Sequence, residues 1–254
     1  TGRIDWTIGY DGETFEERIA TADALVCWTI DTKDLARRAP RLRWIHATGA
    51  GVEGFVTGER VAYGIGGTGG YAEERLVAAE RLLHLPGGID DATAAAVMVR
   101  GLTAWSLGCR AYPIEAGDWI LVHAAAGGVG LILTQMAKMA GAFVIATVST
   151  EAKAELARAA GADEVILYSE QDFETEVKRI TSDAGVNVVY DSVGKSTFEK
   201  SIDCLKPRGY MVLYGNASGP VAEFNPATLG TKGSLFLTRH TLFAYTADRK
   251  SLEW

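Results

Sequence analysis

The sequence has little cysteine and no long apolar run. Its cysteines, Cys27, Cys109 and Cys204, are far apart and form no CxxC pair. This argues against a disulfide framework or a zinc knuckle and favours a reducing compartment, so we expect a cytoplasmic protein. No apolar stretch reaches the roughly 18 residues that a membrane span needs. The first residues, Thr1–Asp5, lack the character of a signal peptide, and because the chain does not begin with Met we expect it to be a fragment.

The sequence also lacks an excess of basic residues. It has 25 Lys and Arg against 32 Asp and Glu, a net charge of −7. This balance argues against a general partner role for nucleic acid or an anionic membrane. Hydrophobic residues make up 48% of the 254 positions, which is enough to bury a sizeable core in one large domain or two ordinary ones.

Signatures of metal and nucleophilic catalysis are missing as well. The sequence has no G-x-S-x-G elbow and no Walker lysine. The histidines have no metal-ligand spacing among themselves or with the cysteines, whereas a catalytic zinc needs about three protein ligands, so we expect no metal. They are His46, His84, His123 and His240. We interpret His123, at a strand end, as a packing residue rather than a catalytic one.

From Asp91 onward, apolar strands alternate with amphipathic helices. Helix signals cover 92–99 and 102–109, and later helices are expected near 128–139, 151–160, 173–180 and 196–205. Strands are expected at 119–123, 143–148, 164–167, 186–190, 210–214 and 234–238. This order predicts an α/β fold with a doubly wound parallel Rossmann sheet.

A glycine loop follows the first of these strands. Gly127, Gly128 and Gly130 open a helix directly after the apolar run that ends at His123. Main-chain N–H groups at such a helix start bind a pyrophosphate, and side chains there would hold the phosphate away. Ala125 stands where the strict G-x-G-x-x-G pattern has its first glycine. A glycine-rich turn without a ligand is the alternative interpretation.

The end of the next strand bears on the choice of cofactor. A site for NAD has an acidic residue there that accepts the ribose hydroxyls, but this chain has Ser149 and no carboxylate before Glu151. A hydroxyl and the ammonium of Lys153 suit a 2′-phosphate, so we expect NADPH. The alternatives are a helix N-cap for Ser149 and a solvated helix residue for Lys153. Asp191 and Ser192 follow a later strand and are expected to face the cofactor crevice, and the acidic residues of 170–176 are expected to begin a solvated helix.

Several motifs of the chain resemble the zinc-independent quinone oxidoreductases of the medium-chain dehydrogenase/reductase superfamily, the ζ-crystallin-like NADPH:quinone reductases. The resemblance covers about residues 55–254, and the matching stretches are Gly58–Tyr63, Arg100–Ala104, His123–Gly130, Val189–Gly194, Tyr214–Gly219 and Lys232–Leu235. It implies a Rossmann domain, a GroES-like β-barrel and a homodimer. The family usually has Lys where this chain has Arg100.

The resemblance also implies site residues. The loop of Gly127, Gly128, Val129 and Gly130 would hold the pyrophosphate of NADPH. The 2′-phosphate would lie among Ser149, Lys153 and Tyr168. The nicotinamide and its ribose would lie near Thr103, Tyr214, Gly215 and Asn216. No catalytic acid is assigned.

The first 54 residues resemble a different family. Ala22–Val26, Ala39–His46 and Thr48–Gly54 look like part of the N-terminal lobe of the D-isomer-specific 2-hydroxyacid dehydrogenases. We therefore expect a small α/β fragment at 1–54, a partial GroES-like β region at 55–97, and a C-terminally truncated Rossmann domain at 98–254.

Three functions are consistent with this organisation. The first is hydride transfer from NADPH to a quinone or an activated enone. The second is an NADPH-binding fragment without catalysis, and the third is a D-2-hydroxyacid dehydrogenase.

Overall fold

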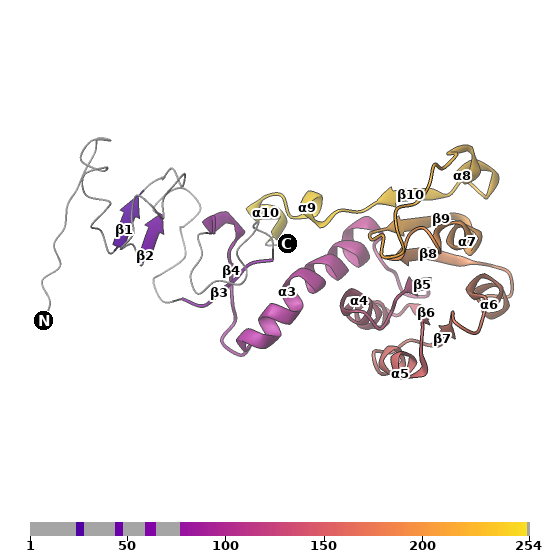
Figure 1. Cartoon of the computed structure of the whole chain (residues 1–254), viewed down its shortest axis with the longest axis horizontal. Coiled ribbons are helices and arrows are strands. Elements are labelled where there is room, and N and C mark those ends of the chain that lie inside the picture. Colours follow the sequence, from indigo (N-terminus) through magenta and orange to yellow (C-terminus); the bar gives the residue numbers. More distant parts are fainter. Residues whose placement is uncertain (1–23, 28–43, 48–58, 65–76, 253–254) are drawn as a thin grey trace, which may run out of the picture. The chain divides into compact units, whose positions relative to one another are not determined.

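The computed structural model describes residues 24–27, 44–47, 59–64 and 77–252 (Figure 1). The chain divides into two compact units, Thr1–Pro86 and Gly87–Trp254. The boundary that we expected at residue 97 lies inside a helix, α3 (Asp91–Trp105). The division into three segments therefore remains a prediction, and each unit is considered by itself.

The first unit contains two small sheets. Strands β1 (Ala24–Cys27) and β2 (Trp44–Ala47) pair in parallel, and the apolar runs at 24–28 and 42–46 predict strands there. Strands β3 (Val61–Ala62) and β4 (Leu83–His84) pair antiparallel, with a 3-10 turn at Ala79–Arg81 before β4. Two residues per strand cannot define a barrel, so the GroES-like assignment stays a prediction. The sequence pattern also predicts helices at 15–20 and 35–38 and a strand at 71–77. The two helices and most of that strand lie outside the described residues.

The second unit is built on a six-stranded parallel sheet, which confirms the predicted fold. Its strand order is β10-β9-β8-β5-β6-β7. The strands are β5 (Trp119–His123), β6 (Phe143–Val148), β7 (Glu164–Leu167), β8 (Val186–Asp191), β9 (Leu205–Leu213) and β10 (Phe236–Arg239). The connections between the first strands are helical because parallel neighbours need long crossovers.

Helices cover both faces of this sheet. On one face lie α3, a π-helical turn at Ser106–Ala111, α4 (Gly128–Met139) and α5 (Glu151–Ala159). On the other face lie α6 (Phe173–Ile180) and α7 (Phe198–Asp203). Three short helices follow: α8 (Ala227–Thr231), α9 (Leu242–Tyr245) and α10 (Arg249–Leu252).

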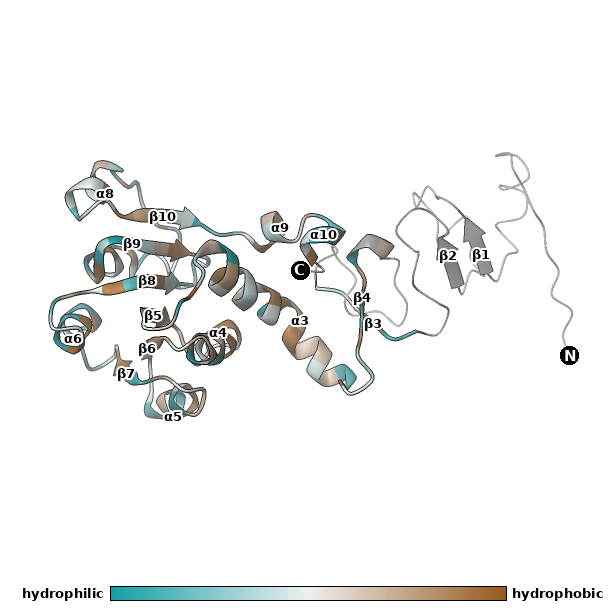
Figure 2. Cartoon of the chain, turned by 180° about the vertical axis from the view of Figure 1, so that it is seen from behind, coloured by the Kyte–Doolittle hydropathy of each residue, from teal (hydrophilic) through white to brown (hydrophobic). Residues whose placement is uncertain are grey.

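Alternate residues of each strand face opposite layers, as the two-residue period of a strand requires. In β5, Ile120 and Val122 pack toward α4, whereas Leu121 packs toward α6. All three side chains are fully buried. Apolar colour accordingly lies on the strands and on the inner sides of the helices (Figure 2). Burial on both faces explains why the strands are continuous apolar runs rather than alternating ones.

One helix prediction was wrong in detail. The two helices expected at 92–99 and 102–109 are one continuous helix, α3, followed by the π-helical turn. The helix passes through Gly101, because an isolated glycine costs a helix only about 1 kcal/mol.

Helix α4 packs an apolar face on the sheet. Its buried positions are Gly130, Leu133, Thr134 and Ala137, and Val129, Ile132 and Met136 pack against the same core.

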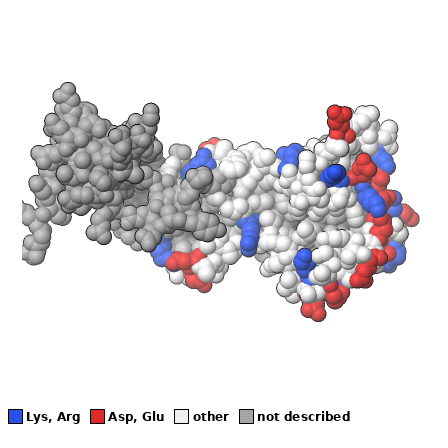
Figure 3. All heavy atoms as spheres, viewed as in Figure 1, with Lys and Arg blue, Asp and Glu red and all other residues white. Residues whose placement is uncertain are grey.

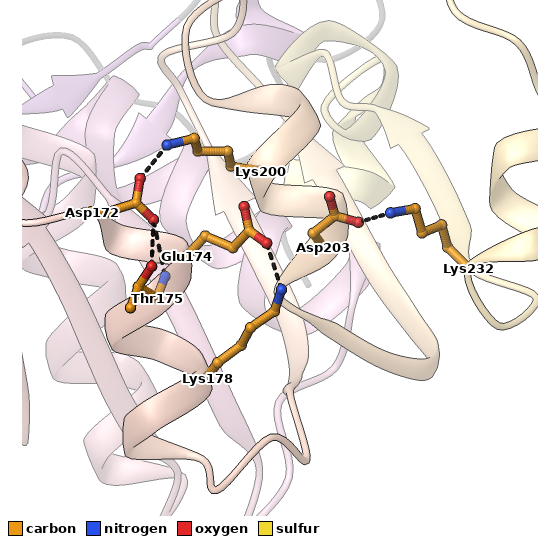
Figure 4. A network of polar contacts seen from close by, with 7 residues as sticks. All are labelled: Asp172, Glu174, Thr175, Lys178, Lys200, Asp203 and Lys232. Carbon is orange, nitrogen blue, oxygen red and sulfur yellow. Dashed lines mark hydrogen bonds and ion pairs between the residues drawn. The ribbon is translucent and has the colours of Figure 1, made fainter.

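The acidic segment 170–176 begins a helix, as predicted, but its charges are paired. Asp172 caps α6 by accepting from the Thr175 N–H at 3.0 Å and binds Lys200, while Glu174 binds Lys178 (Figure 4). These contacts and the helix cap lower the pKa of Asp172 to about 2, with the Lys200 contact as the largest cause. Red and blue atoms are interleaved along this margin of the second unit (Figure 3).

His123 is a buried packing residue, as predicted. Its side chain is 1% exposed, and its two ring nitrogens lie 2.9 Å from the hydroxyl oxygens of Thr147 and Ser201. The ring also packs edge-on against Phe173. Burial lowers the pKa of His123 below the ordinary 6.5, and the charge of Asp191 opposes this shift. The folded protein therefore keeps this histidine neutral.

We expect the free energy of unfolding to fall as the pH drops below 6.5, because the unfolded chain takes up a proton that folded His123 refuses. The loss is about 1.4 kcal/mol per pH unit until the lower folded-state pKa is reached. Urea denaturation from about pH 7.5 to about pH 5 checks this. His123→Gln cannot titrate and should show a shallower pH dependence, so equal slopes in the two proteins would contradict the account.

Candidate functional site

The order of the strands changes direction at the middle of the sheet. From the central strand β5 the chain builds outward through β6 and β7, then returns to the other side of β5 and continues through β8, β9 and β10. The order therefore reverses between β5 and β8. In open α/β sheets of this kind, ligands bind outside the carboxyl ends of the strands at such a reversal. The predicted site residues that follow β5, β6, β7 and β9 all lie at this edge.

The glycine loop joins the carboxyl end of β5 to α4. Gly127 is the N-cap of α4, and its N–H donates to the Ala124 carbonyl oxygen at 2.8 Å. A Cβ built on Gly130 would lie 2.7 Å from three backbone atoms of Ala124 and Ala125. The missing side chain at Gly130 therefore lets the first turn of α4 sit directly on the end of β5.

Gly128 makes room for a side chain rather than for backbone. A Cβ there would lie 2.4 Å from Cδ and 2.5 Å from Nε of Arg100, which comes from α3. The side chain of Arg100, an exposed residue, thus lies over Gly128, the first residue of α4. The motif identified the glycine, but it gave no sign of this contact between α3 and the loop. Val129, next in the loop, is partly buried against the core.

The ends of β6 and β7 bring the three predicted phosphate residues together. Ser149 and Tyr168 directly follow the paired residues Val148 and Leu167. The Lys153 ammonium donates to the Ser149 hydroxyl at 2.9 Å. Tyr168 is 52% exposed. The group thus presents an ammonium and hydroxyls to solvent at the strand ends.

The alternative role considered for Ser149 was wrong. The N-cap of α5 is Thr150, whose side chain accepts from the Lys153 N–H. The Ser149 hydroxyl is therefore not used as a helix cap. The main-chain carbonyl oxygen of Ser149 accepts from the Ser169 hydroxyl at 3.0 Å, and this bond joins the loops that follow β6 and β7.

The ends of β8 and β9 also meet closely. Tyr214 and Gly215 follow β9, and their N–H groups donate to the Asp191 carbonyl oxygen at 2.8 and 3.3 Å. A Cβ on Gly215 would lie 2.4 Å from the Ser192 carbonyl oxygen. Burial raises the pKa of Tyr214 to about 12, and its hydrogen bond with Ser192 opposes this shift. Asn216 continues the same loop, and its carbonyl oxygen accepts from the Gly219 N–H at 2.9 Å.

The Asp191 carboxylate holds a turn instead of facing the crevice, which corrects our expectation for this residue. It is fully buried and accepts from the N–H groups of Val193 and Gly194 at 2.6 and 3.0 Å, and from the Thr197 hydroxyl at 2.7 Å. Three donors satisfy the charge at the end of β8. Asp191 therefore fixes the loop beside Tyr214 rather than acting on a ligand.

Thr103 belongs to α3, and a buried contact links its helix turn to the sheet. The Thr103 hydroxyl donates to the Val99 carbonyl oxygen at 2.7 Å. One turn further along the chain, the buried Ser106 hydroxyl lies 2.9 Å from Nε2 of His240. The main-chain N–H of His240 donates to the Leu213 carbonyl oxygen. This buried pair therefore links the turn of Thr103 to the chain beside Tyr214. The sequence held no sign of the pair, because 134 positions separate its members.

The described residues contain no group of three or more His, Cys, Asp or Glu side chains arranged to hold a metal ion. Among the same residues, no helix is both long enough and apolar enough to cross a membrane.

The family model described as zinc-binding dehydrogenase matches residues 128–247. A quinone oxidoreductase of Pseudomonas aeruginosa is 48% identical over 209 residues, which is 82% of this chain and 64% of that protein. The Escherichia coli quinone oxidoreductase complexed with NADPH superimposes with a TM-score of 0.78 at 44% identity, covering 82% of this chain and 64% of that one. The quinone oxidoreductase of Pseudomonas syringae pv. Tomato DC3000 has a TM-score of 0.78 at 38% identity, covering 88% of this chain and 73% of that one.

The fold and these matches define a member of the medium-chain dehydrogenase/reductase superfamily. Within it, the chain belongs to the quinone oxidoreductases, because identity and structural similarity extend over most of its length. The chain spans 64% of the Pseudomonas aeruginosa relative. The matches do not support the resemblance of residues 1–54 to the D-2-hydroxyacid dehydrogenases.

The two loop glycines should respond differently to alanine. Gly130→Ala meets backbone that cannot move freely, and we expect a loss of about 1–3 kcal/mol in the free energy of unfolding. Gly128→Ala meets only the flexible side chain of Arg100, so its cost should stay within about 0.5 kcal/mol. Urea denaturation of both variants measures the difference. Equal losses would show that the close approach at Gly130 is not what holds α4 on β5.

Proposed function

We propose that the chain forms the NADPH-binding part of a quinone oxidoreductase, which transfers hydride from NADPH to a quinone or an activated enone. The observation that carries the proposal is the Lys153–Ser149 hydrogen bond at the end of β6. A site for NAD would have an acidic residue at this strand end. An ammonium and a hydroxyl favour the additional phosphate of NADPH. The relative from Escherichia coli is complexed with NADPH, which supports the same choice.

The residues present fit this dinucleotide. Gly127 and Gly130 leave no side chain between a pyrophosphate and the N–H groups at the start of α4, where the helix dipole also favours an anion. Arg100 adds a positive charge over Gly128. Ser149, Lys153 and Tyr168 would receive the 2′-phosphate. The nicotinamide end would lie near Thr103, Tyr214, Gly215 and Asn216.

When bound, NADPH supplies the hydride, so the protein's task is to position the cofactor and the substrate and to exclude competing reactions. The buried loop of Asp191 would support Tyr214 and Gly215 from below, and the Ser106–His240 contact would hold the turn of Thr103 beside them. The Thr103 hydroxyl already donates within α3, so we assign it contact with the ribose or ring and not the delivery of a proton. No general acid is assigned.

An NADPH-binding unit without catalysis is the second candidate, and one observation favours it. The match covers 64% of the Pseudomonas aeruginosa relative, so the remainder of that protein has no aligned counterpart in these residues. This candidate predicts cofactor binding without turnover.

We also propose a homodimer and a cytoplasmic location. The dimer proposal is supported by β10, which forms one edge of the six-stranded sheet with Phe236 49% exposed and Leu237 37% exposed. An apolar edge strand can pair with a second copy. The spacing of the cysteines favours a reducing compartment.

Lys153→Ala should weaken NADPH binding roughly ten- to hundred-fold, because one charge-assisted contact is lost. NADH binding should not change, since NADH has no phosphate at this position. Titration of cofactor fluorescence measures both affinities. Lys178→Ala removes a similar surface lysine from the last turn of α6 and serves as the control. Equal effects of Lys153→Ala on the two cofactors would contradict the phosphate assignment.

Addition of a quinone to the protein and NADPH should cause oxidation of NADPH, followed as loss of nicotinamide absorbance against a control without protein. Turnover above that control would rule out the non-catalytic candidate. NADPH binding without turnover would rule out catalysis by this chain and leave the binding unit.

A further inference from the structure

The first turn of α5 contains a carboxylate close in sequence to the proposed 2′-phosphate site. Glu151 is the first residue of the helix, two residues after Ser149 and two before Lys153. A carboxylate at this point repels a phosphate. The dipole of α5 stabilises either anion at the helix start, so the two compete for the same position. The proposed preference for NADPH therefore needs some means of keeping this charge from the cofactor.

Arg158, in the last turn of α5, can neutralise this charge. Nη1 of Arg158 lies 2.5 Å from Oε1 of Glu151. The side chains are 51% and 59% exposed, so solvent surrounds the pair. An exposed ion pair contributes only about 0–1 kcal/mol to stability, so a role in holding α5 in place does not explain this pair.

The spacing of the pair sets how far the two side chains must reach. Residues seven apart lie on the same side of a helix but about 10.5 Å apart along its axis. The two side chains together must span this distance, and the long Arg158 side chain has the ordinary lean of a helical side chain toward the N-terminus. The Arg158 guanidinium therefore reaches back to the Glu151 carboxylate near the start of α5.

We propose that Arg158 determines cofactor specificity by neutralising the charge of Glu151 at the start of α5, beside the 2′-phosphate site. This inference rests on the proposed function. Without Arg158, an unpaired carboxylate shares the start of α5 with a phosphate that carries about −1.5 to −2. NADH has only ribose hydroxyls there, and a carboxylate does not repel them. Arg158 thus raises the affinity for NADPH without touching it.

The test is a comparison of dissociation constants for NADPH and NADH at low salt, by cofactor fluorescence. Arg158→Gln should weaken NADPH binding about three- to four-fold, the size of effect that one charge has through roughly 10 Å of water on a phosphate of about −1.5 to −2. NADH binding should stay the same. The double variant Glu151→Gln/Arg158→Gln should regain the original NADPH affinity, because no carboxylate is left to be paired. In about 1 M salt the effect of Arg158→Gln should vanish, because the Debye length falls to about 3 Å.

Arg179→Gln is the matched control. Arg179 forms a similar exposed pair with Glu176 on α6, and its loss should change neither affinity. If Arg158 had a merely structural role, its loss would change the affinities for NADPH and NADH together, and the change would persist in the double variant.

The outcomes separate this inference from the proposed function. If the unaltered protein prefers NADPH but Arg158→Gln leaves the ratio of the two affinities unchanged, the inference is wrong and the proposed function stands. If Arg158→Gln lowers both affinities alike, or if the double variant does not recover, the inference is likewise overturned. If the unaltered protein binds NADH as tightly as NADPH, the proposed function fails, and the inference fails with it.

Discussion

The close approach of α4 to the end of β5 is the contact on which the site depends. Gly130 permits it, since any side chain there would meet the backbone of Ala124 and Ala125. The contact brings the N–H groups of the first turn to the carboxyl edge of the sheet, where the strand order reverses. The ends of β6 and β9, on opposite sides of β5 in the strand order, then supply Ser149 and Tyr214. The position of the site is thus set by backbone geometry, and the side chains at the strand ends add its chemical specificity.

Electrostatics divides the site into parts with different tasks. Lys153 and Arg100 place positive charge at an edge whose helix starts already favour anions, within a chain of net charge −7. Two carboxylates of this edge are engaged. Asp191 is satisfied by three donors in its turn, and Glu151 is paired with Arg158. The arrangement therefore combines exposed cations with engaged carboxylates, which favours recognition of an additional phosphate.

The sequence predicted the six strands, the glycine loop and the grouping of Ser149 with Lys153, because each depends on local pattern and a known crossover rule. It did not predict contacts between distant segments. The pair of Ser106 and His240 and the packing of Arg100 on Gly128 arise only when α3 is laid beside α4 and β10 beside β9. Local propensity also misled at Gly101, which lies inside α3 because a single glycine costs a helix only about 1 kcal/mol.

The most direct test of the account is whether the N–H groups of the loop bind the cofactor. In a two-dimensional amide NMR spectrum, titration with NADPH should shift the signals of Gly127, Gly128, Val129 and Gly130, and the shifts should saturate together with that of Ser149. Titration with NADH should leave Ser149 less affected than the loop. Binding of NADPH that leaves all four loop signals unmoved would contradict the central claim.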